Sequence, residues 1–350
     1  MRSGLAWNLQ SQGSRSKLGA NRRSGSGYSR EEEVMPTGCS VVIPTKDCLV
    51  YLQQAIQSVM EQSFEPLELI VVDDGSTDGT LPYLENLARS NDKLVVLSGP
   101  GKGPALARNM AIEQARYSHI AFLDADDIWY PNKLGPQLAW HQAYSDAVFS
   151  FTDYRHLDPH GVDMGTCFEF WRNQFQQLPP RAFEMFPEAL SRLLAANIVG
   201  TSTVVAKTKA LRNANGFATD LPSAEDWDLW LRLAASGPVG ISGTVAMDYL
   251  VRPGSETKKR AARIQAMQTI CARYEQERAP AVQNALKKAR ANIWVAQAEM
   301  QREEGHPAAA LRAHLRAAML DPQRKTFVAM LADAKNVVRP KPLDVRERQP

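Results

Sequence analysis

The chain has 350 residues, of which 44% are apolar and 23% charged, and its net charge is only +3. This composition is typical of a globular protein of one or two domains. The net charge is too small to argue for nucleic acid or an anionic membrane as a general electrostatic partner. No apolar run approaches the roughly 20 residues of a membrane-spanning helix, so we expect no transmembrane segment. Scattered cysteines without paired spacing predict buried thiols in a reducing compartment, not a zinc site or disulfides: Cys39, Cys48, Cys167 and Cys271.

Residues 1–36 are predicted to form a disordered tail. They are rich in Ser, Gly, Asn and Arg, and they have no acidic residue before Glu31 and no hydrophobic period. Arg22 and Arg23 precede no apolar segment, which argues against an export signal. An organellar transit peptide and a natural start at Met35 stay open as alternatives.

The next part of the chain alternates strands with helices. Residues rich in Val, Ile and Leu predict strands, and apolar residues at helical spacing predict the helices between them. The strands are expected at 40–44, 67–72, 94–97 and 120–123, and the helices from Leu49, near Thr80 and over 104–116. This alternation predicts right-handed crossovers and a mostly parallel sheet flanked by helices, which is the α/β class.

Two of these strands end in acidic loops. Asp73 and Asp74 follow the second strand, and Asp124, Asp126 and Asp127 follow the fourth. Crowded carboxylates repel one another unless a cation or hydrogen-bond donors lie among them. Mg²⁺ and Mn²⁺ prefer oxygen ligands and usually add substrate phosphates to one or two carboxylates. The alternative is a capped, solvated turn; the location of both loops at the carboxyl ends of strands favours a metal-phosphate site.

The second half of the chain is predicted to be mixed at first and then helical. Further strands are expected at 146–151, 200–206 and 245–252, and helices at 207–215 and 223–235. In the last of these helices Ser223 is the expected cap, with Glu225 and Asp226 in the first turn, where the helix dipole favours acids.

From residue 258 to 336 the chain becomes rich in Ala, Gln, Lys and Arg at helical spacing, and 337–350 is expected to be a loose tail. Six residues fall where a tetratricopeptide repeat would have them: Trp294, Ala298, Gly305, Ala310, Ala317 and Pro322. His306 and His314 are expected at the surface. We interpret this segment as an all-α extension for packing, self-association or a protein partner.

Four motifs together resemble the donor-site motifs of family 2 glycosyltransferases, which have the GT-A fold. They are SVVIPTKD (40–47), ELIVVDDGSTDGT (68–80), ALARNMAI (105–112) and HIAFLDADDIWYPNKL (119–134). The resemblance implies a GT-A domain over 37–257, with a nucleotide-sugar half at 37–134 and an acceptor half at 135–257.

The resemblance also implies roles for the residues that bind the donor. Asp74 would hydrogen-bond the nucleotide base, Asp73 would support that loop or be a plain turn residue, and Arg108 would lie near the nucleotide or be a solvated helix charge. Asp124 would face the sugar or ribose. Asp126 would be the principal ligand of Mn²⁺ or Mg²⁺, with Asp124 or Asp127 as alternatives. The remaining residues expected to line the nucleotide sugar are Pro44, Thr45, Lys46 and Ala125.

On the acceptor side, the resemblance makes Asp226 the general base, with Glu225 orienting it or contacting the acceptor; helix capping is the alternative for both acids. Trp227 and Trp230 would form an acceptor-stacking wall or, at helical spacing, pack in the core. Ser150–Asp153 would lie on the acceptor side, and Arg252 or Ser255 would touch the diphosphate or belong to a plain linker.

The implied function is metal-dependent, inverting transfer of a sugar from a nucleotide sugar, with UDP-sugar preferred, to an acceptor hydroxyl. The Q-x-x-R-W motif of processive synthases is absent, which favours addition of one sugar per encounter. By analogy the acceptor is a glycan, lipid-linked or protein molecule, and the protein is cytoplasmic or peripheral at the inner face of the membrane. The alternative function is that of a catalytically inactive GT-A domain serving as a binding or adaptor module.

Overall fold

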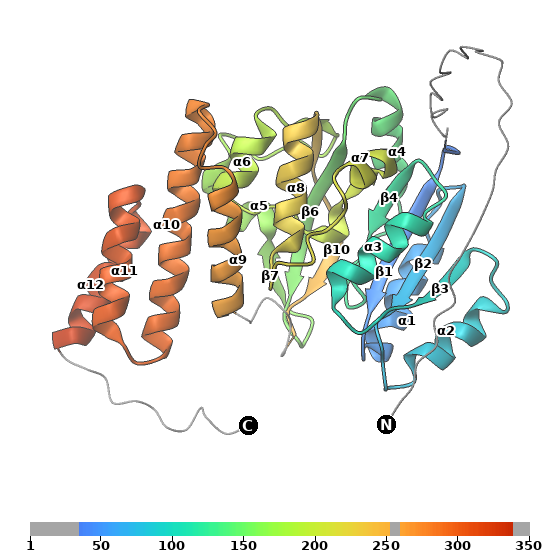
Figure 1. Cartoon of the computed structure of the whole chain (residues 1–350), viewed down its shortest axis with the longest axis horizontal. Coiled ribbons are helices and arrows are strands. Elements are labelled where there is room, and N and C mark those ends of the chain that lie inside the picture. Colours follow the sequence, from blue (N-terminus) through green and yellow to red (C-terminus); the bar gives the residue numbers. More distant parts are fainter. Residues whose placement is uncertain (1–34, 253–259, 339–350) are drawn as a thin grey trace, which may run out of the picture. The chain divides into compact units, whose positions relative to one another are not determined.

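The computed structural model describes residues 35–252 and 260–338 (Figure 1). The predictions made for 1–34, for the loop 253–257 with Ser255, and for the tail 339–350 lie outside the described residues. Val337 and Val338, which were expected to open that tail, instead end a helix.

A single mixed sheet organises the first part of the described chain. Its strands are β1 (Cys39–Thr45), β2 (Leu67–Asp73), β3 (Leu94–Ser98), β4 (His119–Phe122), β5 (Ile128–Trp129), β6 (Phe149–Leu157), β7 (Asp163–Thr166), β8 (Glu184–Met185), β9 (Val205–Lys207) and β10 (Val239–Leu250). The order is β3-β2-β1-β4-β9-β6-β10-β5, with β7 on β6 and β8 on β10. All the longer strands run in one direction and the short β9 opposes its neighbours, so the sheet is mostly parallel, as predicted.

Helices are packed against this sheet (Figure 1). They are α1 (Leu49–Met60), α2 (Thr80–Ala88), α3 (Pro104–Gln114), α4 (Leu134–Ala143), α5 (Cys167–Phe170), α6 (Ala189–Ala195), α7 (Thr208–Asn213) and α8 (Glu225–Ser236). Every residue of β1 and β2 is buried, because side chains on both faces of a covered sheet are removed from water. That is why the central residues of these strands, 41–43 and 69–72, are continuous apolar runs and do not alternate.

The acceptor half differs in detail from the sequence prediction. The segment 200–206 is not one strand: a 3₁₀ turn over Thr201–Thr203 precedes the short β9. Strand β10 begins at Val239, several residues earlier than expected. Gly240 lowers the strand propensity there, but a Cβ at this position would lie 2.4 Å from the Trp140 ring, so close packing of that ring requires a glycine.

The C-terminal part is helical, as predicted. It contains α9 (Arg260–Arg273), α10 (Pro280–Glu303), α11 (Pro307–Leu320) and α12 (Arg324–Val338). The hairpin of α10 and α11 is packed through the small residues Ala298, Ala310 and Ala313, and Gly305, with φ +83°, closes the turn. The likeness to a tetratricopeptide repeat stays a prediction. None of the helices in the described part is long and apolar enough to cross a bilayer.

His314 is buried, which corrects the prediction that it lies at the surface, whereas His306 is exposed. The Nδ1 atom of His314 is 2.6 Å from Asp333 Oδ2 in α12, and Arg302 Nε in α10 donates to Asp333 Oδ1 at 2.7 Å. A buried carboxylate is tolerated when it is paired and hydrogen-bonded. The three residues therefore join α10, α11 and α12.

Two more histidines lie together where β4 meets α4: His141 is buried and His119 is partly buried. The rings of His119 and His141 are 4.9 Å apart. Burial lowers the pKa of His119 to about 4 and the pKa of His141 to about 3. Both side chains are therefore neutral in the folded protein near pH 7.

We expect these histidines to make the fold sensitive to mild acid. Between an unfolded pKa of about 6.5 and the lower folded values, the unfolded chain binds protons that the folded chain does not, so stability falls as pH falls. The loss should reach up to about 3 kcal/mol per histidine by pH 4.5. Urea unfolding at pH 7.5 and 4.5 measures it. The His119→Gln/His141→Gln variant should lose less stability over this interval; an equal loss would contradict the prediction.

Candidate functional site

The candidate site lies at the edge of the sheet where the parallel strands end. Strand β1 ends at Thr45, β2 at Asp73, and β4 leads into the loop of Asp124 to Asp127. Strand β10 runs in the same direction and leads to Arg252. The sequence-predicted donor residues therefore share one edge, which is where ligands bind in open α/β sheets.

The two acids after β2 have different surroundings. Asp74 is buried, and its two carboxylate oxygens accept the backbone N–H groups of Gly101 (2.8 Å) and Gly103 (2.6 Å). Asp73 Oδ2 accepts the Ser76 N–H at 3.2 Å, but Asp73 Oδ1 is buried without a hydrogen-bond partner in the described chain. Asp74 thus holds the glycine loop, while Asp73 carries the unpaired oxygen.

The neighbouring end of β1 has a similar unpaired group. Thr45 is opposite Asp73 in the parallel register, and its Oγ1 atom is also buried without a partner among the described residues. Buried polar atoms are normally hydrogen-bonded, so an unpaired pair at a strand end indicates a ligand. Pro44 is buried in β1 and Lys46 is exposed, so only the latter has a solvent-facing side chain.

Arg108 is the most constrained cation of the site. It is only 5% exposed, so it is not a solvated helix charge. Its Nη2 donates to Asp124 Oδ1 at 2.6 Å and its Nη1 donates to Glu225 Oε1 at 3.1 Å, while the guanidinium lies 5.1 Å from the centre of the Phe217 ring. Burial opposes the charge, but the two carboxylates raise the pKa of Arg108 above its ordinary value. Arg108 therefore connects the acidic loop after β4 with the start of α8.

A second arginine is paired with the middle acid of this loop. Arg252 Nε donates to Asp126 Oδ2 at 2.5 Å, and its guanidinium lies 5.4 Å from the centre of the Tyr51 ring. Ala125 is buried between the two partly exposed acids. The loop thus presents two carboxylates, each of which has an arginine partner.

The third acid, Asp127, is directed into the protein. Its Oδ2 accepts the Ser202 hydroxyl at 2.5 Å, and Ser202 Oγ in turn accepts the Asp124 N–H at 2.9 Å. Burial, followed by the charges of Asp124 and Asp126, raises the pKa of Asp127 well above its ordinary value. Asp127 Oδ1 is buried without a hydrogen-bond partner in the described chain, so the role of Asp127 as an alternative metal ligand stays a prediction.

Helix α8 begins differently from the prediction. Its N-cap is Ala224, with φ 56°, and no side chain caps it, so Ser223 is not the cap. Asp226 Oδ1 accepts the Trp227 N–H at 2.7 Å, and Asp226 Oδ2 accepts the Thr201 hydroxyl at 3.2 Å. Both oxygens of Asp226 are thus held by donors. Burial raises the pKa of the neighbouring Glu225 above its ordinary value, although Arg108 opposes the shift.

Two hydroxyls of the 3₁₀ turn join the two acidic regions. Thr201 contacts Asp226 and the adjacent Ser202 contacts Asp127, so the loop after β4 and the start of α8 lie close together. This role was not predicted from the sequence, because residues 200–206 were interpreted as a strand. The run Thr201-Ser202-Thr203, polar but between apolar residues, is the signal that could have indicated it.

Several residues predicted for the acceptor side are buried instead. Trp227 and Trp230 lie in the core, so they cannot form an acceptor-stacking wall. Ser150 is fully buried, and Asp153 Oδ1 accepts the N–H groups of Tyr154 and Phe168 at 2.8 and 3.0 Å. These side chains therefore support the fold.

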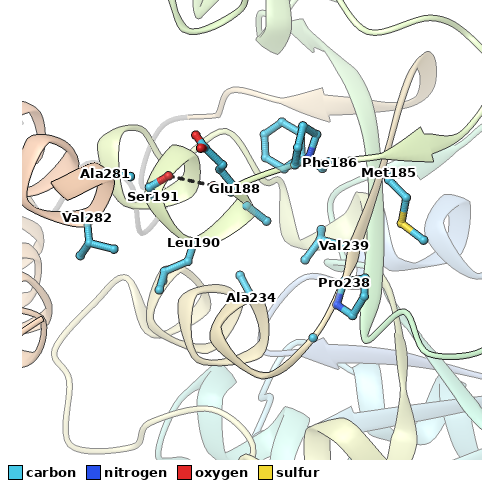
Figure 2. Close-up of a pocket in the computed structure, with 13 residues that line it drawn as sticks. Met185, Phe186, Glu188, Leu190, Ser191, Ala234, Pro238, Val239, Ala281 and Val282 are labelled. Atoms are coloured by element: carbon cyan, nitrogen blue, oxygen red, sulfur yellow. Dashed lines mark hydrogen bonds between the residues drawn. The ribbon is translucent and has the colours of Figure 1, made fainter. Parts of the chain in front are cut away.

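A separate cavity of about 580 Å³ lies near the opposite end of β10 (Figure 2). It is lined mainly by apolar residues of β8, α6, α8, β10 and α10, among them Met185, Leu190, Val239 and Val282. It contains none of the sequence-predicted site residues.

The residues present fit a divalent metal only with help from a substrate. No group of three or more His, Cys, Asp and Glu side chains in the described ranges could hold a metal by itself. Asp126 offers a hard carboxylate that is partly exposed, at 18%. Mg²⁺ and Mn²⁺ commonly take one or two carboxylates and complete their shell with phosphates and water. This donor set suits a metal that binds together with a diphosphate.

Parts of the chain are similar in sequence to known glycosyltransferases. Residues 40–188 match the model described as Glycosyl transferase family 2. An uncharacterized glycosyltransferase of Rickettsia felis is 30% identical over 206 residues, which are 58% of this chain and 31% of that protein. The chain thus spans about a third of the length of the curated relatives that it first matches.

Two solved structures have the same fold. S. aureus TarS 1-349, in complex with UDP-GlcNAc, has a TM-score of 0.59 at 19% identity, covering 86% of this chain and 90% of that chain. The mannosyltransferase PcManGT from Pyrobaculum calidifontis, in complex with GDP-Man and Mn²⁺, has a TM-score of 0.58 at 20% identity, covering 87% and 83%. The predicted GT-A fold is confirmed.

We expect the Arg108→Met substitution to destabilise the fold strongly, because it leaves the carboxylates of Asp124 and Glu225 without their shared cation. Breaking a buried pair in this way typically costs about 3–5 kcal/mol. Arg108→Lys should cost less, since it keeps the charge. Adding Glu225→Gln to Arg108→Met should restore part of the loss. Urea unfolding of wild type, Arg108→Met, Arg108→Lys and the double variant measures their free energies of unfolding. Equal free energies in the four proteins would refute the bridging role.

Proposed function

We propose that the chain, whose residues 40–188 match the model of glycosyl transferase family 2, transfers a sugar from a nucleotide-sugar donor to an acceptor hydroxyl. The observation that carries the proposal is the Arg108 bridge between Asp124 and Glu225. It keeps the acidic loop proposed for the donor next to the helix proposed for the acceptor. A transfer reaction needs both ends of the displacement in one place.

We propose that Thr45 and Asp73 recognise the base of the donor. Asp73 Oδ1 can only accept a hydrogen bond when ionised, whereas the Thr45 hydroxyl can donate one. Uracil presents an N–H beside a carbonyl oxygen, which matches this pair. Guanine also presents an N–H, at N1, beside its O6 carbonyl, so this pair by itself fits either base. A UDP-sugar is the proposed donor, as in the structural neighbour TarS in complex with UDP-GlcNAc, with Asp74 acting through the glycine loop that it holds.

In this proposal Asp126 holds Mn²⁺ or Mg²⁺ together with the donor diphosphate. When bound, such an ion neutralises charge on the leaving diphosphate. Arg252 contacts the same carboxylate and has a guanidinium that can pair with phosphate oxygens. In this proposal the positive charge of Arg252 would lie near the negative charge that develops on the leaving group.

Asp226 is the proposed general base. Its carboxylate would take the proton from the acceptor hydroxyl as that oxygen bonds to the anomeric carbon and the bond from this carbon to the diphosphate oxygen breaks. Direct displacement of this kind inverts the configuration of the anomeric carbon. Glu225 is committed to Arg108, so it serves to position the helix and not as a second base. We further propose that one sugar is added per encounter.

Enzyme assays with divalent metal test this function. With UDP-sugars and Mn²⁺, wild type should hydrolyse or transfer the donor. Asp226→Asn should keep donor affinity and lose at least about 10²-fold in turnover. Asp126→Asn should lose metal-dependent donor binding as well. Turnover in Asp226→Asn equal to that of wild type would reject the base. Binding of nucleotide sugars by wild type without turnover for any acceptor would support the alternative of a binding module.

The two acids after β2 should respond differently to substitution. Asp73→Asn should weaken UDP binding by about 10-fold or more with little change in stability, because an unpaired acceptor is removed. Asp74→Asn should lower the stability by about 1–3 kcal/mol, since a carboxylate that accepts two amide N–H groups is lost. Calorimetric UDP binding and urea unfolding separate the two effects. If Asp74→Asn alone weakens binding at full stability, the assignment is reversed.

A further inference from the structure

We propose that the helical extension contributes to the candidate active site by supporting the start of α8, and that Arg273 of α9 is a positioning residue for Asp226. This inference rests on the proposed function, because it takes Asp226 as the general base. It goes further in giving a role in the reaction to a part of the chain outside the residues that match the family model.

The key contact is a buried carboxylate on α8. Asp228, in the first turn of that helix, is fully buried. Its Oδ2 accepts Arg232 Nε at 2.8 Å, and its Oδ1 accepts Arg273 Nη1. Arg232 lies one turn further along the same helix, but Arg273 comes from the extension. A buried carboxylate requires such partners, so α8 depends on a residue of α9 for its charge balance.

The two arginines continue the network on either side of α8. Arg232 Nη2 donates to the Gly216 carbonyl at 2.8 Å, and the next residue, Phe217, exchanges two hydrogen bonds with the Asn109 side chain in α3. Arg273 Nη2 is also 3.7 Å from Asp220 Oδ2, in the loop before α8. Asp228 therefore ties the start of α8 to α3, to its own preceding loop and to the extension.

A second connection reaches the residue between Asp226 and Asp228. Trp227 Nε1 donates to the Leu193 carbonyl in α6 at 2.8 Å. Asn292 Nδ2 in α10 donates to the Ala195 carbonyl at the end of the same helix at 3.1 Å. Apolar residues of α9 and α10, such as Ile270, belong to the same hydrophobic cluster as Trp227. The extension thus supports both residues that follow Asp226.

This arrangement predicts an effect on turnover and not on donor affinity. A base must lie within hydrogen-bond reach of the proton that it takes, and a small displacement of its helix lowers the rate. Base recognition by Thr45 and Asp73 takes place at the ends of β1 and β2 and does not involve α8. Loosening the first turn of α8 should therefore lower kcat and leave the donor Kd unchanged.

The matched control is another ion pair of the extension. Arg290 in α10 pairs with Glu275, which follows α9, and both side chains are about half exposed, at 40% and 49%. Neither partner belongs to α8. Arg290→Met therefore removes an arginine of the same extension without disturbing Asp228. Arg273→Lys is the conservative variant, since it keeps a positive charge beside that carboxylate.

The test uses the full chain with Arg273→Met, Arg273→Lys and Arg290→Met. We expect Arg273→Met to lower kcat by 10- to 100-fold with donor Kd within 2-fold of wild type, Arg273→Lys to recover part of the loss, and Arg290→Met to match wild type. Hydrogen exchange of the amides at the start of α8 should be faster in Arg273→Met than in Arg290→Met. Because exchange is measured without turnover, it tests the coupling even if wild type proves inactive.

The outcomes separate the two proposals. Faster exchange in a wild type without transferase activity would support the coupling of α9 to α8 while the proposed function fails. Unchanged exchange at α8 in Arg273→Met would overturn the coupling. A kcat equal to that of wild type, or an equal loss in Arg290→Met, would overturn the positioning role. If Arg273→Met does not fold, the Arg273→Lys variant decides between these outcomes by the same two measurements.

Discussion

The site depends on a buried guanidinium shared by two carboxylates from distant parts of the chain. Arg108 is removed from water, and a charge in that position is stable only with close opposite charges. Asp124 and Glu225 provide them. This contact connects α3, the loop after β4 and the start of α8. The separation between the proposed donor and acceptor sides is thereby set by one rigid, planar group.

Other contacts reinforce that connection, and each uses a different kind of interaction. The Thr201 and Ser202 hydroxyls contact Asp226 and Asp127 from consecutive positions of one turn. On the other side of α8, Asp228 is held by Arg232 and Arg273. The start of α8 is thus fixed by ion pairs and hydrogen bonds on more than one side. Pre-organised supporting contacts of this kind keep a reacting group in place.

The three acids of the loop after β4 have different partners. Asp124 pairs with Arg108, Asp126 pairs with Arg252, and Asp127 is directed toward Ser202. Asp126 is partly exposed and lies next to Arg252, a cation suited to phosphate. A metal at this loop would need ligands from a bound diphosphate, which links metal binding to donor binding. The chemistry of the site therefore follows from burial as much as from residue type.

The sequence by itself determined the class of fold and the edge of the sheet where the acids lie. Apolar runs separated by helical periods predict a parallel sheet, and parallel strands place the residues that follow them at one edge. The four motifs indicated the resemblance to family 2 glycosyltransferases. These features depend on periodicity and order along the chain, which are local properties, and the GT-A fold then agreed with them.

Only the tertiary structure decided the partner of each side chain. The roles of Asp73 and Asp74 differ because the amides of Gly101 and Gly103 reach one of them and not the other. His314 is buried because Asp333 in a later helix offers it a partner. Arg108 has its partner Glu225 more than a hundred positions away. Burial and pairing arise from contacts between distant segments, so local pattern could name the chemical groups but not which of them meet.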